Sequence, residues 1–102
     1  MTCRTFREGL ITTVEIGTLR NYCSCKVHHE TKTLGIEVFG ELDNELKRYC
    51  FYQIKNLLKD LDDSFTAFVD KTDLRANKFT KYLGLQLESE ILGYNKFVWL
   101  NQ

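Results

Sequence analysis

The sequence lacks the residues and runs that would make it a membrane or secreted protein. Its 102 residues contain no proline and only six glycines, so its loops must also turn through asparagine and aspartate side chains. No apolar run is long enough to cross a bilayer, and the first residues lack the apolar core of a secretory signal. We therefore expect a cytoplasmic protein that does not associate with a membrane.

The sequence also lacks an excess of charge of either sign. Lysine plus arginine (14) balances aspartate plus glutamate (14), so the formal net charge is zero. Without a net positive charge, nucleic acid is not an expected partner. With 43% hydrophobic and 27% charged residues the chain should fold, and its length predicts a single domain over residues 1–102.

Four cysteines are present, and without an export signal we expect free thiols rather than disulfides. They are Cys3, Cys23, Cys25 and Cys50. The Cys23-x-Cys25 pair precedes His28 and His29, which by residue type suggests zinc. A single intervening residue on a strand, however, directs both thiols to one face without the turn of a zinc knuckle. We therefore expect buried small side chains here and no metal site.

The first 40 residues have the composition of β-strands. Residues 10–27 are rich in Thr, Val, Ile, Tyr and Cys, with Gly17 and Asn21 as punctuation, which predicts two strands or a hairpin. After a polar stretch, residues 34–39 alternate between apolar and other side chains, so Leu34, Ile36 and Val38 share one face. This stretch is predicted to be a further strand.

A long helix follows a capping segment at residues 42–44. Apolar side chains recur there every three or four positions, at Leu46, Cys50, Phe51, Ile54, Leu57, Leu58 and Leu61. Residues 65–69 then form a nearly continuous apolar run, which is typical of a strand covered on both faces. A strand, a helix and a buried strand in this order predict a right-handed crossover with parallel pairing.

The last 30 residues predict a short helix and a hairpin. The helix runs from Thr72 to its terminal Gly84, and Leu74, Ala76, Phe79 and Leu83 are expected to face the sheet. Residues 85–91 and 94–100 read as two antiparallel strands. The expected fold is α/β (α+β), a mixed twisted sheet of about six strands with two main helices.

Residues 34–100 resemble the C-terminal part of the GNAT superfamily, the Gcn5-related N-acetyltransferases. In that family a strand leads through a phosphate loop to a long helix, a buried strand, a short helix and a closing strand pair. The family's short helix carries N-x-x-A-x-x-φ-Y-x-K-x-G-F. The matching frame here is Asp73, Ala76, Phe79, Thr80, Gly84 and Leu85, with the lysine offset to Lys81 or Lys78. The resemblance implies a truncated GNAT-like fold, similar to the reduced, motif-poor members that bacteriophages encode.

The resemblance implies acetyl-CoA as the cofactor. It would lie between the strands at residues 34–39 and 65–69, with its pyrophosphate at the start of the long helix. The residues that the resemblance places at the cofactor are Val38, Phe39, Leu46, Lys47, Arg48, Asp73, Ala76 and Phe79.

The phosphate loop itself departs from the family pattern. No glycine occurs between residues 40 and 84, so the family's glycine-rich signature is missing, and the acidic side chains within residues 41–45 would repel phosphates. Lys47 and Arg48 are cations that could compensate. Alternatively, the acids stabilise the helix N-terminus and the basic pair is simply solvated.

Amine acetylation needs a base for the ammonium proton and an acid for the leaving thiolate. In the resemblance a strand glutamate is the base, which here is Glu37, although a solvent-facing residue is the alternative interpretation. At the position where the family has the tyrosine that acts as the acid, this sequence has Thr80, whose hydroxyl is too weak an acid for that role. Tyr82 lies about 200° around the helix from that position. Tyr94, or else Tyr52, remains as the tyrosine that would supply the proton.

Two functional hypotheses follow. In the first, the protein is a GNAT-like binding module with a degenerate acetyl-CoA site, probably of phage type, that acts on a host or other cellular protein. Exposed aromatic side chains on a sheet face without helices would form its partner surface or a homodimer contact. In the second, it is an active acetyl-CoA-dependent N-acetyltransferase of a protein or small-molecule amine.

Overall fold

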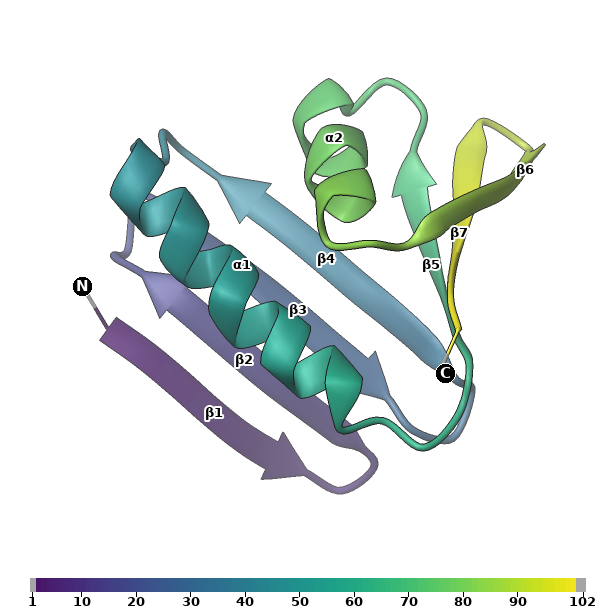
Figure 1. Cartoon of the computed structure of the whole chain (residues 1–102), viewed down its shortest axis with the longest axis horizontal. Coiled ribbons are helices and arrows are strands. Elements are labelled where there is room, and N and C mark those ends of the chain that lie inside the picture. Colours follow the sequence, from purple (N-terminus) through teal and green to yellow (C-terminus); the bar gives the residue numbers. More distant parts are fainter. Residues whose placement is uncertain (1, 101–102) are drawn as a thin grey trace.

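The computed structural model describes residues 2–100, which form one sheet of seven strands and two helices (Figure 1). In chain order these are β1 (Thr2–Glu8), β2 (Ile11–Gly17), β3 (Tyr22–His28), β4 (Thr33–Phe39), α1 (Asn44–Lys59), β5 (Phe65–Asp70), α2 (Leu74–Tyr82), β6 (Gln86–Ile91) and β7 (Tyr94–Trp99). The mixed α+β class predicted from the sequence is therefore confirmed.

The strands lie in the order β1-β2-β3-β4-β5-β7-β6. Every neighbouring pair is antiparallel except β4 and β5, which are parallel and joined by α1 as the sequence predicted. Strand β1 is not among the elements predicted from the sequence. That strand reads TCRTFRE, and its residues are mostly exposed, so it shows neither an apolar run nor a clean alternation.

Both helices lie on the same face of the sheet (Figure 1). The core between the helices and the sheet contains the predicted apolar stripe of α1, of which Cys50, Ile54 and Leu58 are fully buried. No described helix covers the opposite face of the sheet. None of the helices within residues 2–100 combines the length and the apolarity that crossing a lipid bilayer requires.

The packing of α2 differs in part from the prediction. Ala76 and Leu83 are buried and Phe79 is half-buried, but Leu74, at the first position of α2, is 78% exposed. A polar residue, Asn77, is buried instead. Its side-chain amide donates to the carbonyl oxygens of Asp70 (2.8 Å) and Asp73 (2.7 Å), so α2 is attached to the end of β5 by hydrogen bonds.

The parallel strands β4 and β5 pair only at their first residues. The paired positions are Thr33 with Thr66 and Leu34 with Ala67, although β4 continues to Phe39 and β5 continues to Asp70. Figure 1 shows the two strands diverging from this point, with α1 and α2 lying over the two sides of the opening. The splayed strands ahead of a long amphipathic helix, expected from the resemblance, are therefore present.

Candidate functional site

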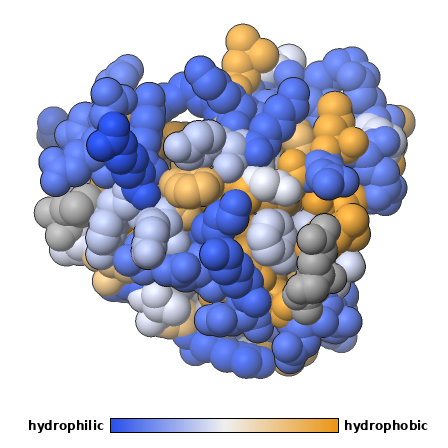
Figure 2. Space-filling model, viewed as in Figure 1, coloured by the Kyte–Doolittle hydropathy of each residue, from blue (hydrophilic) through white to orange (hydrophobic). Residues whose placement is uncertain are grey.

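A groove of about 810 Å³ lies between the end of β4, the start of α1 and the outer side of α2. Its lining residues are Val38, Leu42, Asn44, Lys47, Arg48, Arg75, Lys78, Phe79, Lys81 and Tyr82. The volume falls within the range of typical small-molecule sites. Hydrophilic side chains extend over both helices on this face of the molecule, while hydrophobic ones gather on the side of β6 and β7 (Figure 2).

The groove is strongly basic although the chain as a whole is neutral. Two cations come from α1 and three from α2, and no carboxylate is among the described lining residues. The ion pairs found within residues 2–100 involve none of these five side chains. Their positive charges are therefore not neutralised within the described part of the chain, and an anion in the groove would interact with several of them at once.

One acidic residue before α1, Asp43, is engaged in a structural contact. Its side chain accepts a hydrogen bond from the backbone N–H of Leu46 at 2.8 Å, which makes it the N-cap of α1. A cap carboxylate also interacts favourably with the positive end of the helix dipole. The alternative interpretation of this acid as a helix cap is thus the one that the structure shows, whereas Lys47 and Arg48 line the groove.

The loop between β4 and α1 is held by side chains from other elements. The backbone N–H of Glu41 donates to the side-chain oxygen of Asn21 at 2.8 Å. On the other side, the guanidinium of Arg75 donates to the carbonyl oxygen of Gly40. Because Arg75 also lines the groove, this contact connects the start of α1 with α2 across it.

The eight cofactor-binding positions expected from the resemblance divide into two groups. Val38, Lys47, Arg48 and Phe79 meet around the groove. The other four lie outside its lining: Phe39 stacks on Tyr22 with ring centroids 5.4 Å apart, Leu46 packs against the core, Asp73 caps α2, and Ala76 is buried beneath it.

Sequence reasoning missed part of the basic lining. Arg75 and Tyr82 were not singled out for the site, and Lys78 and Lys81 were considered only as offsets of a motif lysine. Arg75, Lys78 and Lys81 recur every three residues, so a basic stripe along one side of α2 was visible in the sequence. The sequence did not show, however, that this basic stripe would face the start of α1.

Glu37 lies on the face of the sheet opposite to the helices. It alternates along β4 with Ile36 and Val38, which pack toward the core. The phenol of Tyr22 donates a hydrogen bond to the Glu37 carboxylate at 2.7 Å, and this bond raises the pKa of Tyr22. Glu37 therefore faces away from the basic groove and has a defined partner.

Neither tyrosine considered as the acid lines the groove. Tyr94 begins β7 opposite Asp70 of β5 and is 47% exposed, and Tyr52 is 66% exposed on α1. The hydroxyl of Thr80, in the slot of the family tyrosine, is fully buried and donates to the carbonyl oxygen of Ala76 at 2.7 Å. Tyr82 is the tyrosine of the groove, and its ring lies 4.6 Å from that of Phe51.

The cysteines are free thiols in the structure. Cys23, Cys25 and Cys50 are fully buried between the sheet and α1, and Cys3 is exposed. Burial raises the pKa of Cys25 to about 12. A hydrogen bond with Cys50, and then burial, raise the pKa of Cys23. Within residues 2–100 no three His, Cys, Asp or Glu side chains gather as a metal site would require.

Comparison with known proteins gives matches in structure alone. No protein-family model matches the sequence, and no curated protein matches it either. Among solved structures, the chain is similar to the N-acetyltransferase PseH of Campylobacter jejuni in complex with acetyl coenzyme A. The TM-score is 0.62 at 13% identity, over 93% of this chain and 71% of PseH.

A second similar structure is the spermidine N-acetyltransferase SpeG of Vibrio cholerae, as a chimera with hSSAT. Its TM-score is 0.54 at 10% identity, over 89% of this chain and 67% of the other. At these identities the likeness concerns the fold. The splayed strands, the crossover helix and these two similar structures together show that the chain has a GNAT-like fold.

Proposed function

We propose that the protein binds acetyl-CoA in the basic groove and is a GNAT-like protein with low or no acetyl-transfer activity. The observation that carries this proposal is the set of five basic side chains, none in an ion pair within the described residues, around an 810 Å³ groove at the end of β4 where it diverges from β5. The GNAT-like fold and the acetyl-CoA complex of PseH support the choice of ligand.

The residues present fit a ligand with a phosphate-rich end and a less polar arm. Lys47 and Arg48, beside the N-terminus of α1, would hold phosphates together with Arg75, Lys78 and Lys81. Val38, Leu42 and Phe79 supply apolar surface between the charged side chains and the splayed strands. When bound, acetyl-CoA supplies an activated acetyl group on a thioester.

Glu37 is the residue that we assign as the base for an acceptor amine. It faces the side of the sheet away from the groove, so an amine would approach from that side, through the opening between β4 and β5. The hydrogen bond from Tyr22 holds its carboxylate in place. A carboxylate at hydrogen-bond distance from an ammonium group can accept its proton.

The chain lacks the other proton-transfer group of the family. Because the Thr80 hydroxyl is buried and bonded within its own helix, it cannot protonate a leaving thiolate. Among the described residues, Tyr82 is the only tyrosine that lines the groove, and it packs on Phe51 instead of occupying the family position. We infer that cofactor binding is retained while transfer is slow.

A second candidate function is that of a binding module for a cellular protein, which would be a host protein if the chain is phage-encoded. The open sheet face favours it, since Phe39 (53%), Phe68 (49%) and Tyr94 (47%) are about half exposed there. Such aromatic side chains are enriched at protein interfaces. A binding function does not require a group at the position of Thr80 that could protonate a leaving thiolate.

Calorimetric titration with acetyl-CoA tests the proposal. We expect saturable binding that Arg75→Ala weakens about three- to tenfold, since each surface cation contributes on the order of 1 kcal/mol. Lys26→Ala is the control, because Lys26 is an exposed cation on the opposite face. If the unaltered protein gives no heat at millimolar acetyl-CoA, the groove is not a cofactor site and the binding module remains.

A further inference from the structure

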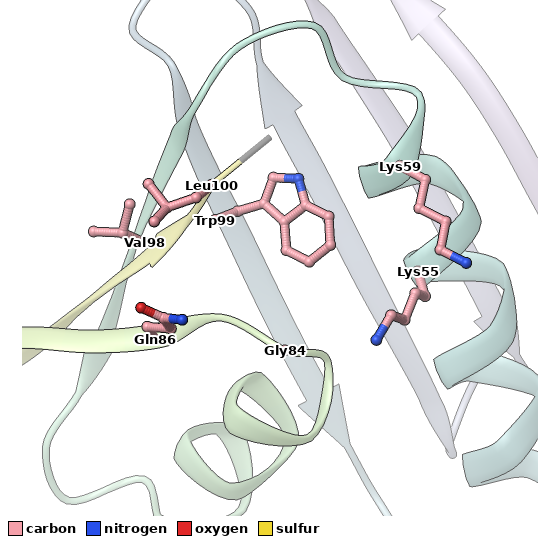
Figure 3. A pocket seen from close by; sticks show the side chains of 7 residues that line it. All are labelled: Lys55, Lys59, Gly84, Gln86, Val98, Trp99 and Leu100. Carbon is pink, nitrogen blue, oxygen red and sulfur yellow. The ribbon is translucent and has the colours of Figure 1, made fainter. Parts of the chain in front are cut away.

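A second cavity, of about 320 Å³, lies between the C-terminal half of α1 and the end of β7 (Figure 3). It is lined by Lys55, Lys59, Gly84, Gln86, Val98, Trp99 and Leu100. These residues come from the C-terminal half of α1, the loop after α2, β6 and the end of β7. No lining residue is shared with the basic groove. Lys47 and Lys55 lie eight positions apart on α1, or about 12 Å along the helix axis.

Lys55 is one of the two charged side chains that line this cavity. Its side chain extends from α1 toward the loop that holds Gly84 (Figure 3). The ammonium lies 3.5 Å from the point that a Cβ atom on Gly84 would occupy, and Cζ3 of Trp99 lies 3.6 Å from the same point. The absence of a side chain at Gly84 therefore leaves open the space where the cation and the indole come together.

Lys55 is a half-buried residue, and its ammonium has no acceptor among the described residues. Within residues 2–100 it forms no hydrogen bond and no ion pair, and its nearest stabilising contact is the ring of Phe51, whose centroid is 5.3 Å away. Lys59 stands four residues further along α1, so the two like charges face the same side of the helix and repel each other. An anion between Lys55 and Lys59 would give the Lys55 ammonium an acceptor and would reduce the repulsion between the two cations.

The rest of the cavity wall combines the indole of Trp99 with the polar side chain of Gln86 and with Gly84, Val98 and Leu100. The indole of Trp99 stands between β7 and α1, whereas the neighbouring side chains of Val98 and Leu100 extend to the other side of the backbone (Figure 3). Trp99 is only partly exposed, and its Nε1 donor is buried without a partner among the described residues. An aromatic face beside an uncompensated cation is suited to a planar ligand that carries a negative charge.

We propose that this cavity binds a small planar aromatic carboxylate. Its ring would pack on Trp99 and its carboxylate would accept hydrogen bonds from Lys55, with Lys59 adding longer-range attraction. The volume lies at the lower end of the range for ligand sites, which fits a ligand of one or two rings and excludes one the size of acetyl-CoA. The site is separate from the proposed cofactor groove and does not depend on it.

The single tryptophan of the chain provides a direct measurement. Because Trp99 is the only tryptophan, its fluorescence reports on this cavity alone. We expect benzoate to change the fluorescence saturably in the millimolar range, with an affinity at least fivefold above that of benzamide, its uncharged analogue. Benzylamine, which has the opposite charge, should give no saturable change. Equal binding of benzoate and benzamide, or no change with either, would overturn the proposal.

Two variants locate the binding. Lys55→Gln removes the charge, shortens the side chain by one atom and keeps a hydrogen-bond donor, and it should weaken benzoate binding at least fivefold. Lys26→Gln, on the opposite face, should leave it unchanged, and so should Arg75→Ala in the basic groove. Circular dichroism checks that each variant is folded. Should Lys55→Gln fail to fold, the comparison of benzoate with benzamide on the unaltered protein still decides the question.

Discussion

At the scale of single residues, the side chains of the site differ in whether they already form hydrogen bonds within the protein. Thr80 and Asp43 both occupy positions where the GNAT resemblance places functional chemistry. Each is bonded to the backbone of its own helix, Thr80 to the carbonyl of Ala76 and Asp43 to the N–H of Leu46. Local hydrogen bonds of this kind are typical of threonine and aspartate at helices. Of the five groove cations, only Arg75 has a hydrogen bond of this kind, to the carbonyl oxygen of Gly40, and none is in an ion pair within the described residues, so binding is better supported than catalysis.

Glu37 is the residue on which acetyl transfer would depend under the proposed function. If Glu37 removes the amine proton, Glu37→Gln should lower the rate of acetyl transfer on the order of 10²-fold, the usual contribution of a general base. The affinity for acetyl-CoA should stay unchanged, because Glu37 faces away from the groove. The measurement is thiol release from acetyl-CoA with a polyamine or peptide amine, beside calorimetry.

Glu15→Gln is the matched control for this prediction. Glu15 lies on the same face of the sheet and pairs with Arg4 at 3.6 Å, but its strand, β2, is two strands away from the opening. An equal loss of rate in both variants would remove the assignment of Glu37. If the unaltered protein transfers no acetyl group, the second candidate function is the one that stands.

The buried thiols make stability depend on pH in the alkaline range. Burial raises the pKa of Cys25 from the unfolded value of about 8.5 to about 12. The folded state therefore holds its proton more tightly, and the stabilisation is complete below about pH 8.5 and is lost as the pH rises toward 12. Above pH 8.5 this thiol should lower the free energy of unfolding by about 1.4 kcal/mol per pH unit.

Urea unfolding between pH 7.5 and 9.5, roughly the range around the unfolded thiol pKa, measures this slope. Cys25→Val removes the titrating group and places a β-branched side chain, which strands favour, on β3, so the slope should become shallower. Cys3→Val, at the exposed thiol of β1, should leave it unchanged. A slope that both variants leave intact would mean that Cys25 does not titrate on unfolding.

At the scale of the elements, the position of α1 depends on the loop that precedes it. Gly40 has a φ of +77°, and a Cβ atom there would overlap the carbonyl oxygen of Arg20. Gly40→Ala should therefore destabilise the protein by about 2 kcal/mol or more, because both the left-handed backbone and the overlap add cost. Thermal unfolding measures the change, which should also weaken acetyl-CoA binding, since the loop places Lys47 and Arg48.

Gly9→Ala is the comparison for this prediction. Gly9 also has a positive φ, of +59°, but a Cβ atom there meets nothing within 4 Å. Its cost should be limited to the backbone conformation, about 1 kcal/mol. Similar losses in the two variants would show that the contact with the β2–β3 turn contributes little to the position of α1.

Helices and strands with a buried face were easier to predict from the sequence than exposed ones. The stripe of α1 repeats along 16 residues and faces a sheet, so its period was clear in the sequence. In contrast, β1 and β6 are exposed along nearly their whole length, and such strands carry little apolar alternation. β6 was found because a Leu92-Gly93 turn and the apolar β7 follow it, whereas β1 was missed because it has no comparable signal.

At the scale of the whole molecule, the neutral net charge conceals a separation of charge. Five of the fourteen basic side chains line one groove, and the described acids lie elsewhere. Lys47 and Arg48 were assigned from the sequence, but their meeting with Arg75, Lys78 and Lys81 depends on the crossing of α1 and α2 over the splayed strands. Packing of this kind between segments about 30 residues apart leaves no local pattern. The sequence therefore predicted the opening but not its charge.

This separation of charge predicts a salt dependence that net charge alone would not. Raising the sodium chloride concentration from about 50 to about 500 mM shortens the Debye length severalfold and should weaken acetyl-CoA binding about tenfold. Acetyl-pantetheine, which has the thioester arm without the phosphates, should bind more weakly and with no such dependence. Calorimetry at the two salt concentrations measures both ligands.

Because the chain has no net charge, a salt dependence limited to the phosphate-bearing ligand would locate the interaction in the groove. If the salt dependence is smaller in Arg75→Ala, part of it is assigned to that side chain. Equal salt dependence for both ligands would instead show that the five cations do not contact the phosphates.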